Sequence, residues 1–222
     1  MIEIAPNVFQ IPVMPRQMIN AYLIGSVLID AGIKSSGKTL LKAIGSRKLT
    51  AHALTHAHPD HQGASALICE RLGLPFWVSA GDKAAAETGD VVGTMSNPNH
   101  PILRFEQRFF AGRGYPVTRT LKEGDLVEGF RVLETPGHST GHLSFYRESD
   151  GVLIAGDVLR NVNYGTTLPG LGEPPAMFTP DIPQNRRSIQ RIAALHPKVV
   201  CFGHGPVMRD PQRLAAFAKG LK

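Results

Sequence analysis

The feature that most constrains this chain is one short segment, which reads His56-Ala57-His58-Pro59-Asp60-His61. Four side chains that commonly bind metal ions fall within six residues, and packing alone does not explain that density. The two leading histidines alternate, as they do at the end of a strand, whereas the following Asp and His are adjacent, as where a chain turns into a helix. One segment can therefore supply two metal ions, with His56 and His58 facing one ion and Asp60 and His61 facing the other.

Three single residues of the same chemical types follow in the sequence, namely His138, Asp157 and His204. Imidazole nitrogens and carboxylate oxygens suit zinc, and also iron or manganese. A closed structural zinc site usually contains several thiolates, whereas a site of nitrogen and oxygen ligands leaves room for water. Two metal ions about 3.5–4 Å apart can share a hydroxide and stabilise a developing oxyanion. Asp157, in Ala155-Gly156-Asp157, is the natural carboxylate to bridge such a pair.

These motifs occur in a fixed order: His-x-His-x-Asp-His, then Thr135-Pro136-Gly137-His138, Ala155-Gly156-Asp157, and Phe202-Gly203-His204-Gly205. The ordered set resembles the metallo-β-lactamase-fold superfamily of metallohydrolases, as does the early segment Val27-Leu28-Ile29-Asp30-Ala31-Gly32. The resemblance implies that His56, His58 and His138 bind a first metal ion, that Asp60, His61 and His204 bind a second, and that Asp157 bridges them. It also implies a four-layer αββα sandwich, in which two mixed β-sheets are flanked by helices.

Apolar strand-like runs alternate with helical segments along the chain, and this pattern alone predicts only an α/β fold. We expect strands within residues 2–13, 19–30, 51–55, 75–78, 125–134, 143–146, 152–154 and 198–202. We expect helices near residues 35–45, 64–72, 81–87, 185–195 and 211–221, the first capped by Ser35 or Ser36. The metal motifs then fall on loops at strand ends. A length of 222 residues and a hydrophobic fraction of 42% suit a single hydrolase domain over residues 1–222.

Two segments rich in glycine, proline and aromatic residues look like insertions over the site, residues 93–119 and 161–180. Long loops in a compact domain are often functional. Tyr164 is a candidate catalytic residue that donates a hydrogen bond to an oxyanion, with a packed loop aromatic as the alternative. Met177 and Phe178 are candidates for the pocket wall.

The other histidines carry weaker signals. His142 is either a group that orients a metal ligand or an ordinary histidine at the start of a strand. His52, His100 and His196 have no partner pattern, so we interpret them as ordinary histidines.

The charge and composition of the chain indicate which binding partners and which cellular compartment to expect. The net charge is +6, but no basic run or regular aromatic interleaving resembles a nucleic-acid groove, so a nucleic-acid partner is not expected. No run of 18 apolar residues predicts a membrane span, and the N-terminus does not resemble a signal peptide. The only two cysteines, Cys69 and Cys201, lie in apolar contexts, which favours free thiols and a cytoplasmic location.

The predicted activity is metal-assisted hydrolysis of a thioester, lactone or related acyl substrate by a hydroxide that bridges two metal ions. Zinc is the favoured metal, with iron or manganese open. Asp60 can bind the second ion and also orient the nucleophile or relay its proton. The substrate is a small molecule, weak opening of β-lactams is a plausible side activity, and the sequence leaves the oligomeric state open.

Among the known members of this superfamily, several subclasses fit less well. Secreted β-lactamases carry an export signal, and many have cysteine at the position of Asp157. Thioesterases that act on glutathione conjugates carry a C-terminal helical domain, whereas only residues 207–222 follow the last motif here. The alternatives are a mononuclear iron sulfur-oxidising dioxygenase, a nucleic-acid phosphodiesterase, or a scaffold protein that has lost catalysis. The complete set of second-metal residues argues against the first and the last.

Overall fold

The computed structural model describes residues 1–93, 95 and 97–221. Positions 94 and 96 of the predicted insertion 93–119, and position 222 of the predicted domain 1–222, lie outside the described residues. Within the described part, no helix combines the length and the apolar character that crossing a membrane requires.

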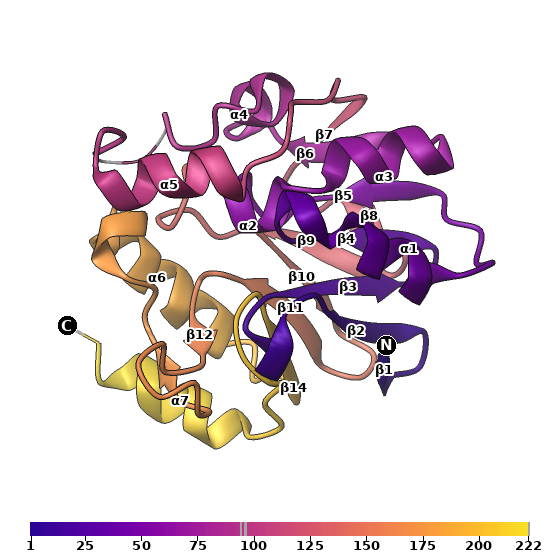
Figure 1. The fold of residues 1–222 in the computed structure, drawn as a ribbon. Coiled ribbons are helices and arrows are strands. Elements are labelled where there is room, and N and C mark those ends of the chain that lie inside the picture. Colours follow the sequence, from indigo (N-terminus) through magenta and orange to yellow (C-terminus); the bar gives the residue numbers. More distant parts are fainter. Residues whose placement is uncertain (94, 96, 222) are drawn as a thin grey trace.

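Two large mixed β-sheets form the centre of the molecule (Figure 1). The first sheet has seven strands in sequence order: β1 (Ile2–Ala5), β2 (Val8–Pro12), β3 (Asn20–Ile24), β4 (Val27–Ile29), β5 (Ala51–Ala53), β6 (Phe76–Ser79) and β7 (Arg119–Leu121). Strands β1 to β4 form an antiparallel meander, and β4 to β7 run parallel. The crossovers between parallel strands carry helices, as such connections require.

The second sheet has the order β14-β11-β10-β9-β8. Its strands are β8 (Leu126–Val127), β9 (Phe130–Glu134), β10 (Leu143–Arg147), β11 (Val152–Gly156) and β14 (Val199–Phe202). Strands β11 and β14 are parallel, while the other pairs are antiparallel. A separate two-stranded ribbon consists of β12 (Arg160–Asn161) and β13 (Leu171–Gly172).

Helices cover the outer face of each sheet (Figure 1). On the first sheet lie α1 (Gly37–Ile44), α3 (Ser65–Leu72), α4 (Lys83–Thr88) and α5 (Pro101–Phe109), with the short α2 (Pro59–Gln62) near the sheet edge. On the second sheet lie α6 (Ile182–Ala193) and α7 (Pro211–Lys219). Short 3-10 turns occur at η1 (Pro15–Gln17), η2 (Lys34–Ser36) and η3 (Ala176–Phe178). The predicted four-layer αββα arrangement is confirmed.

The alternation of side chains along each strand explains why three apolar cores form. In β3, Leu23 packs in the core under the helices, whereas Tyr22 and Ile24 pack in the core between the sheets. In β11, Ile154 faces the space between the sheets and Leu153 faces α6 and α7. Sheets buried on both faces must read as nearly continuous apolar runs, which is how these strands appear in the sequence.

Most predicted elements are present, with differences at their ends. Ser36 precedes α1, but its side chain makes no capping hydrogen bond, and a 3-10 turn precedes the helix instead. Helix α6 begins at Ile182 rather than at Asn185, because the Asp181 carboxylate accepts the Gln184 N–H at 2.8 Å and caps the helix there.

The two insertion segments contain more regular secondary structure than their glycine and proline content suggests. Residues 93–119 include α5, and β7 begins at the end of this segment. Pro101 occupies the first turn of α5, and the His100 ring accepts the Ile102 N–H at 3.3 Å. Residues 161–180 include part of the β12–β13 ribbon and the turn η3.

Candidate metal centre

The ends of strands from both sheets meet at one edge of the sandwich. Because β11 and β14 are parallel, Asp157 and His204, which follow them, reach the same edge. His56 and His58 follow β5 in the first sheet, and His138 lies in the loop between β9 and β10. The alternating pair therefore comes from the loop after a strand, and Asp60 and His61 lie on the helix α2, as the sequence predicts.

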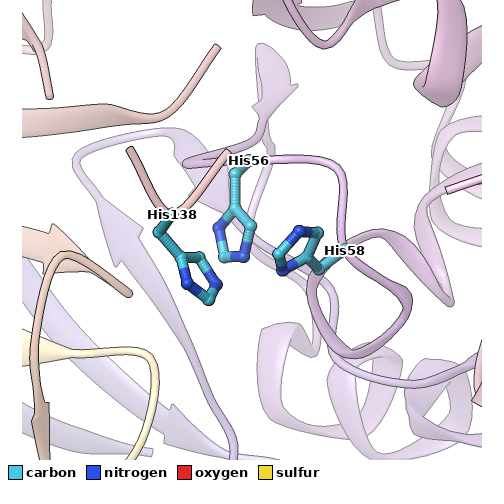
Figure 2. A group of neighbouring side chains, drawn as sticks. All are labelled: His56, His58 and His138. Atoms are coloured by element: carbon cyan, nitrogen blue, oxygen red, sulfur yellow. The ribbon is translucent and has the colours of Figure 1, made fainter. Parts of the chain in front are cut away.

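All seven predicted ligands come together in three overlapping groups, within each of which the ligand atoms lie no more than 4.8 Å apart. The groups are His56, His58 and His138; Asp60, His61 and His204; and a linking group of His56, His61 and Asp157. Figure 2 shows the first group, whose three rings converge from two separate loops. The centroid of the His138 ring lies 4.8 Å from that of His56 and 4.5 Å from that of His58.

The Asp157 carboxylate lies between the two sides of the cluster. Its Oδ1 atom is 3.5 Å from Nε2 of His61. Its Oδ2 atom is 3.6 Å from Nε2 of His138 and 2.9 Å from Nε2 of His204. The carboxylate therefore lies close to His138 of the first group and to His61 and His204 of the second, which is the position that a bridging ligand needs.

In four of the histidines, Nδ1 makes a hydrogen bond to another group of the protein, so Nε2 is directed at the cluster. His61 Nδ1 donates to the Asp30 carboxylate at 2.9 Å, and His204 Nδ1 donates to the Met18 carbonyl at 2.5 Å. His56 and His138 contact threonine hydroxyls in the same way, at 3.0 and 3.2 Å. Metal-binding histidines are typically oriented by such outer hydrogen bonds.

Burying a polar atom without a hydrogen-bond partner costs free energy, so such atoms indicate which kind of ligand a site can bind. Among the described residues, four cluster atoms are buried and make no hydrogen bond: Nε2 of His56, of His61 and of His138, and Oδ1 of Asp157. Imidazole nitrogens and a carboxylate oxygen are the donors that divalent metals such as zinc, iron and manganese take. The residues present therefore fit a metal centre.

Two buried aspartates support the cluster, and sequence reasoning did not assign them this role. Asp30 follows β4 and accepts both the N–H and the O–H of Thr55, each at 2.8 Å, in addition to the His61 ring. Because β4 and β5 are parallel neighbours, their ends place Asp30 beside Thr55. In the sequence, Asp30 belongs to the segment Val27–Gly32, which resembles the family but does not reveal that Asp30 holds a metal-binding histidine in place.

Asp82 ties together the two loops that carry the first group of histidines. Its carboxylate accepts the Ala57 N–H at 2.9 Å, and the Ser139 hydroxyl and the Gly141 N–H at 2.9 and 3.0 Å. Ala57 separates His56 from His58, and Ser139 follows His138. One carboxylate thus fixes the spacing of the loops, and it also occupies the Ser139 hydroxyl.

His142 lies beneath the cluster and orients Asp157. Its Nε2 accepts the Asp157 N–H at 3.0 Å, while its Nδ1 contacts the Thr135 hydroxyl at 2.9 Å. Burial, opposed in part by the charge of Asp157, lowers the pKa of His142 to about 3, so the ring stays neutral and can accept. Of the two interpretations of this residue, the structure supports the orienting one.

The remaining histidines lie away from the cluster. His52 is buried and contacts the Leu28 carbonyl and the Ser65 hydroxyl, and burial lowers its pKa to about 4. His100 caps α5, and His196 is exposed. They serve ordinary structural roles, as expected.

The two sides of the cluster differ in charge. Burial, and then the neighbouring imidazoles, lower the pKa values of His56 and His138. Burial also acts to lower the pKa of His61, but the charges of Asp157, Asp30 and Asp60 outweigh it and raise that pKa to about 10. The carboxylates therefore concentrate negative potential where Asp60, His61 and His204 meet, and this potential attracts cations.

A cavity of about 280 Å³ opens onto the cluster. One side of it is formed by the His58, Asp60, His138, Asp157 and His204 side chains. The facing wall is mostly apolar and includes Met14, Met18, Ile19, Phe110, Pro175 and Phe178. Phe178 thus lines the cavity as expected, whereas the adjacent Met177 is not among its lining residues.

Two polar residues outside the cluster also line the cavity, Tyr164 and Glu106. The Tyr164 ring is 40% exposed, and its centroid lies 5.7 Å from that of His204. The Arg160 guanidinium lies 5.0 Å from the Tyr164 ring centroid. Partial desolvation in the cavity lining raises the pKa of Tyr164 to about 12, so its hydroxyl keeps its proton near neutral pH. Sequence reasoning did not single out Glu106.

Comparison with known proteins agrees with this geometry. The family model described as the metallo-beta-lactamase superfamily matches residues 14–204. A probable metallo-hydrolase of Bacillus subtilis, YflN, is 29% identical over 198 residues, which cover 81% of this chain and 75% of that protein. A hydroxyacylglutathione hydrolase of Halorhodospira halophila is 30% identical over 71% of this chain, but the match spans only 48% of that protein.

A solved structure of similar size is that of TTHA1623 in a di-iron-bound form. It superposes with a TM-score of 0.70 and 29% sequence identity, covering 94% of this chain and 96% of that one. The sequence motifs, the sandwich of two sheets and the match over most of the chain all agree. The chain belongs to the metallo-β-lactamase superfamily and is a metal-dependent hydrolase.

Proposed function

We propose that this protein is a binuclear metal-dependent hydrolase of a small thioester, lactone or related acyl ester. The observation that carries the proposal is the convergence of seven histidine and aspartate side chains at one end of a largely apolar cavity. Two divalent ions, zinc in the first instance, would supply a Lewis acid and an activated water at this place. The di-iron form of TTHA1623 makes iron a reasonable second choice.

In this proposal the ligands divide as their positions suggest. His56, His58 and His138 hold the first ion, Asp60, His61 and His204 hold the second, and Asp157 bridges. The division is supported by the ligand-atom groups and by the position of the Asp157 carboxylate, which lies close to His138 on one side and to His61 and His204 on the other. His142 and Asp30 keep Asp157 and His61 oriented through the hydrogen bonds described above.

Asp60 and Tyr164 are proposed to act on the substrate and its nucleophile. The Asp60 carboxylate lies 3.2 Å from Nε2 of His204 and also faces the cavity, so it can orient a water molecule or take its proton. Tyr164 is protonated near neutral pH and lines the same cavity, so its hydroxyl can donate to the acyl oxygen as negative charge develops there.

The volume and the lining of the cavity support the proposed substrate class. A volume of about 280 Å³ suits a small acyl group, and the apolar wall suits an alkyl or aromatic chain. The hydroxyacylglutathione hydrolase relative is, by its name, a thioester hydrolase, which supports testing thioesters first. Weak opening of β-lactams is proposed as a side activity. A cytoplasmic location is also proposed, and the two buried free thiols, Cys69 and Cys201, support it.

The test is metal content by elemental analysis of protein purified without added metal, together with turnover of thioester, lactone and β-lactam substrates. We expect about two ions per chain and hydrolysis of an acyl substrate that chelation abolishes. One iron per chain with oxygen uptake and no hydrolysis would instead identify a dioxygenase. Cleavage of a phosphodiester without acyl hydrolysis would identify the nuclease alternative.

A further inference from the structure

The side chains that line the cavity do not share the basic character of the chain as a whole. The chain carries a net charge of +6, yet no lysine or arginine is among the cavity-lining residues that the structure describes. Among the described residues, and outside the proposed metal ligands, the one charged residue that lines the cavity is Glu106. The excess of basic residues therefore does not extend to the place where a substrate would bind.

Glu106 comes from α5, the helix within the segment 93–119. Its main-chain carbonyl accepts the N–H groups of Phe110 and Ala111, at 2.8 and 3.0 Å, which fixes this part of the helix end. Its side chain is half-buried and shares the cavity with Asp60 and His204. No hydrogen bond or ion pair of its carboxylate is found within the described residues.

A half-buried carboxylate with no basic partner is costly to ionise. Burial, and then the charge of Asp60, raise the pKa of Glu106 to about 7, with His204 acting in the opposite direction. A cationic or N–H-donating group in the cavity would relieve this cost, and a second carboxylate there would add to it. The apolar wall beside Glu106 offers no alternative partner for a charged substrate group.

We propose that Glu106 is a specificity-determining residue that contacts the substrate, selecting acyl substrates that present an ammonium or N–H group and disfavouring those that present a carboxylate. This inference rests on the proposed acyl hydrolase function and names its substrate class. The preferred substrate is an apolar acyl ester or thioester whose polar end is cationic or an amide. Glutathione thioesters and common β-lactams, which carry carboxylates, are then poor substrates.

The test uses three hexanoyl thioesters that differ in the charge of the thiol part: thiocholine (cationic), N-acetylcysteamine (neutral, with an amide N–H) and 3-mercaptopropionate (anionic). The metal-loaded wild type should favour the cationic over the anionic thioester in kcat/KM. Glu106→Gln should lower that ratio by about tenfold, the usual size of one partly desolvated charge interaction, with metal content unchanged. Glu148→Gln is the matched control, because Glu148 is exposed and lies in the turn after β10.

Binding is measured in parallel, with ketone analogues of the three thioesters in which a methylene replaces the sulfur. If the thioesters are hydrolysed but their ratios are the same in the wild type and Glu106→Gln, the role of Glu106 is overturned and the hydrolase function stands. If no thioester or ester is hydrolysed but Glu106→Gln still weakens binding of the cationic analogue relative to the anionic one, the hydrolase proposal fails and the recognition role stands. Equal binding of all analogues by both proteins contradicts the inference directly.

Discussion

The metal cluster and the apolar wall that faces it are built in different ways. The cluster lies on loops that follow strands and on the short helix α2, is largely buried, and is fixed by hydrogen bonds to Asp30, Asp82 and main-chain groups. The wall comes from connecting segments, namely the residues around η1, the segment 93–119 and the segment 161–180, and its contacts are mainly apolar. Metal binding and the choice of substrate are therefore proposed to depend on separable parts of the chain.

If this separation is correct, substitutions in the cluster and its supports should change metal content, whereas substitutions in the wall should change the kinetics with metal content unchanged. The strongest expected effect is that of Asp157→Ala. Removing the carboxylate between the two ligand groups should reduce metal content to one ion or none and lower kcat/KM by about 10³-fold or more, because both ions lose a shared ligand. Elemental analysis and steady-state kinetics on the same sample measure both. Unchanged activity in a metal-depleted variant would contradict the ligand assignment.

Asp30→Asn tests the support beneath the cluster. Asp30 is buried and accepts three hydrogen bonds, from Thr55 and His61. In the asparagine variant, the side-chain NH2 group would face at least one of these donors. Metal affinity should fall by about 10- to 100-fold, as for other groups that orient a metal-binding histidine. Competition with a chelator of known affinity gives the value. Asp90→Asn, in an exposed loop, is the control, and equal metal affinity in both variants would show that Asp30 does not support the site.

Tyr164→Phe tests the one aromatic residue for which a catalytic role is proposed. Loss of its hydroxyl should lower kcat by about 10- to 100-fold, somewhat less than for a fully buried oxyanion donor, with metal content unchanged. Tyr146→Phe on β10 removes a hydroxyl remote from the cavity and serves as the control. A change in KM alone would assign Tyr164 to the wall rather than to the reaction.

The selectivity for charge should depend on pH through Glu106. A carboxylate is ionised above its pKa, and burial with the charge of Asp60 raises the pKa of Glu106 to about 7. The cationic-to-anionic ratio of kcat/KM should therefore rise with pH as Glu106 ionises, by about tenfold at most. In the metal-loaded protein the midpoint of this rise should lie below 7, because a metal ion beside Asp60 offsets the charge of Asp60. Taking the ratio cancels the effects of pH that both substrates share. In Glu106→Gln the ratio should not vary with pH.

Phe178→Ala should have the smallest effect. The ring is half-buried in the cavity wall, so its loss should raise KM for a hexanoyl substrate by about threefold to tenfold and affect an acetyl substrate less. Leu168→Ala, an exposed position in the same segment, is the control. Loss of metal from Phe178→Ala would show that the segment 161–180 supports the cluster, which would remove the distinction between the two regions.

The same contrast explains what could be predicted from sequence. The seven cluster residues were predictable because their side chains are chemically distinctive and four of them lie within residues 56–61. The strands were predictable because both sheets are buried on both faces and read as apolar runs. The resemblance supplied the four-layer arrangement, since an α/β pattern alone does not specify it.

The supports and the wall were not predictable for physical reasons. The contact between Asp30 and His61 joins residues 31 positions apart through the parallel pairing of β4 and β5, which sequence does not display. Glu106 lies on a helix with Arg104 and Arg108, where a charged side chain is ordinarily solvated. Only the orientation of α5 reveals that this one carboxylate faces the cavity.

The proposed binuclear hydrolase is best tested by measuring metal stoichiometry and hydrolysis in one sample, before and after chelation. We expect about two divalent ions per chain, loss of thioester or ester hydrolysis when they are removed, and recovery when zinc is restored. Hydrolysis at the full rate by metal-free protein would contradict it.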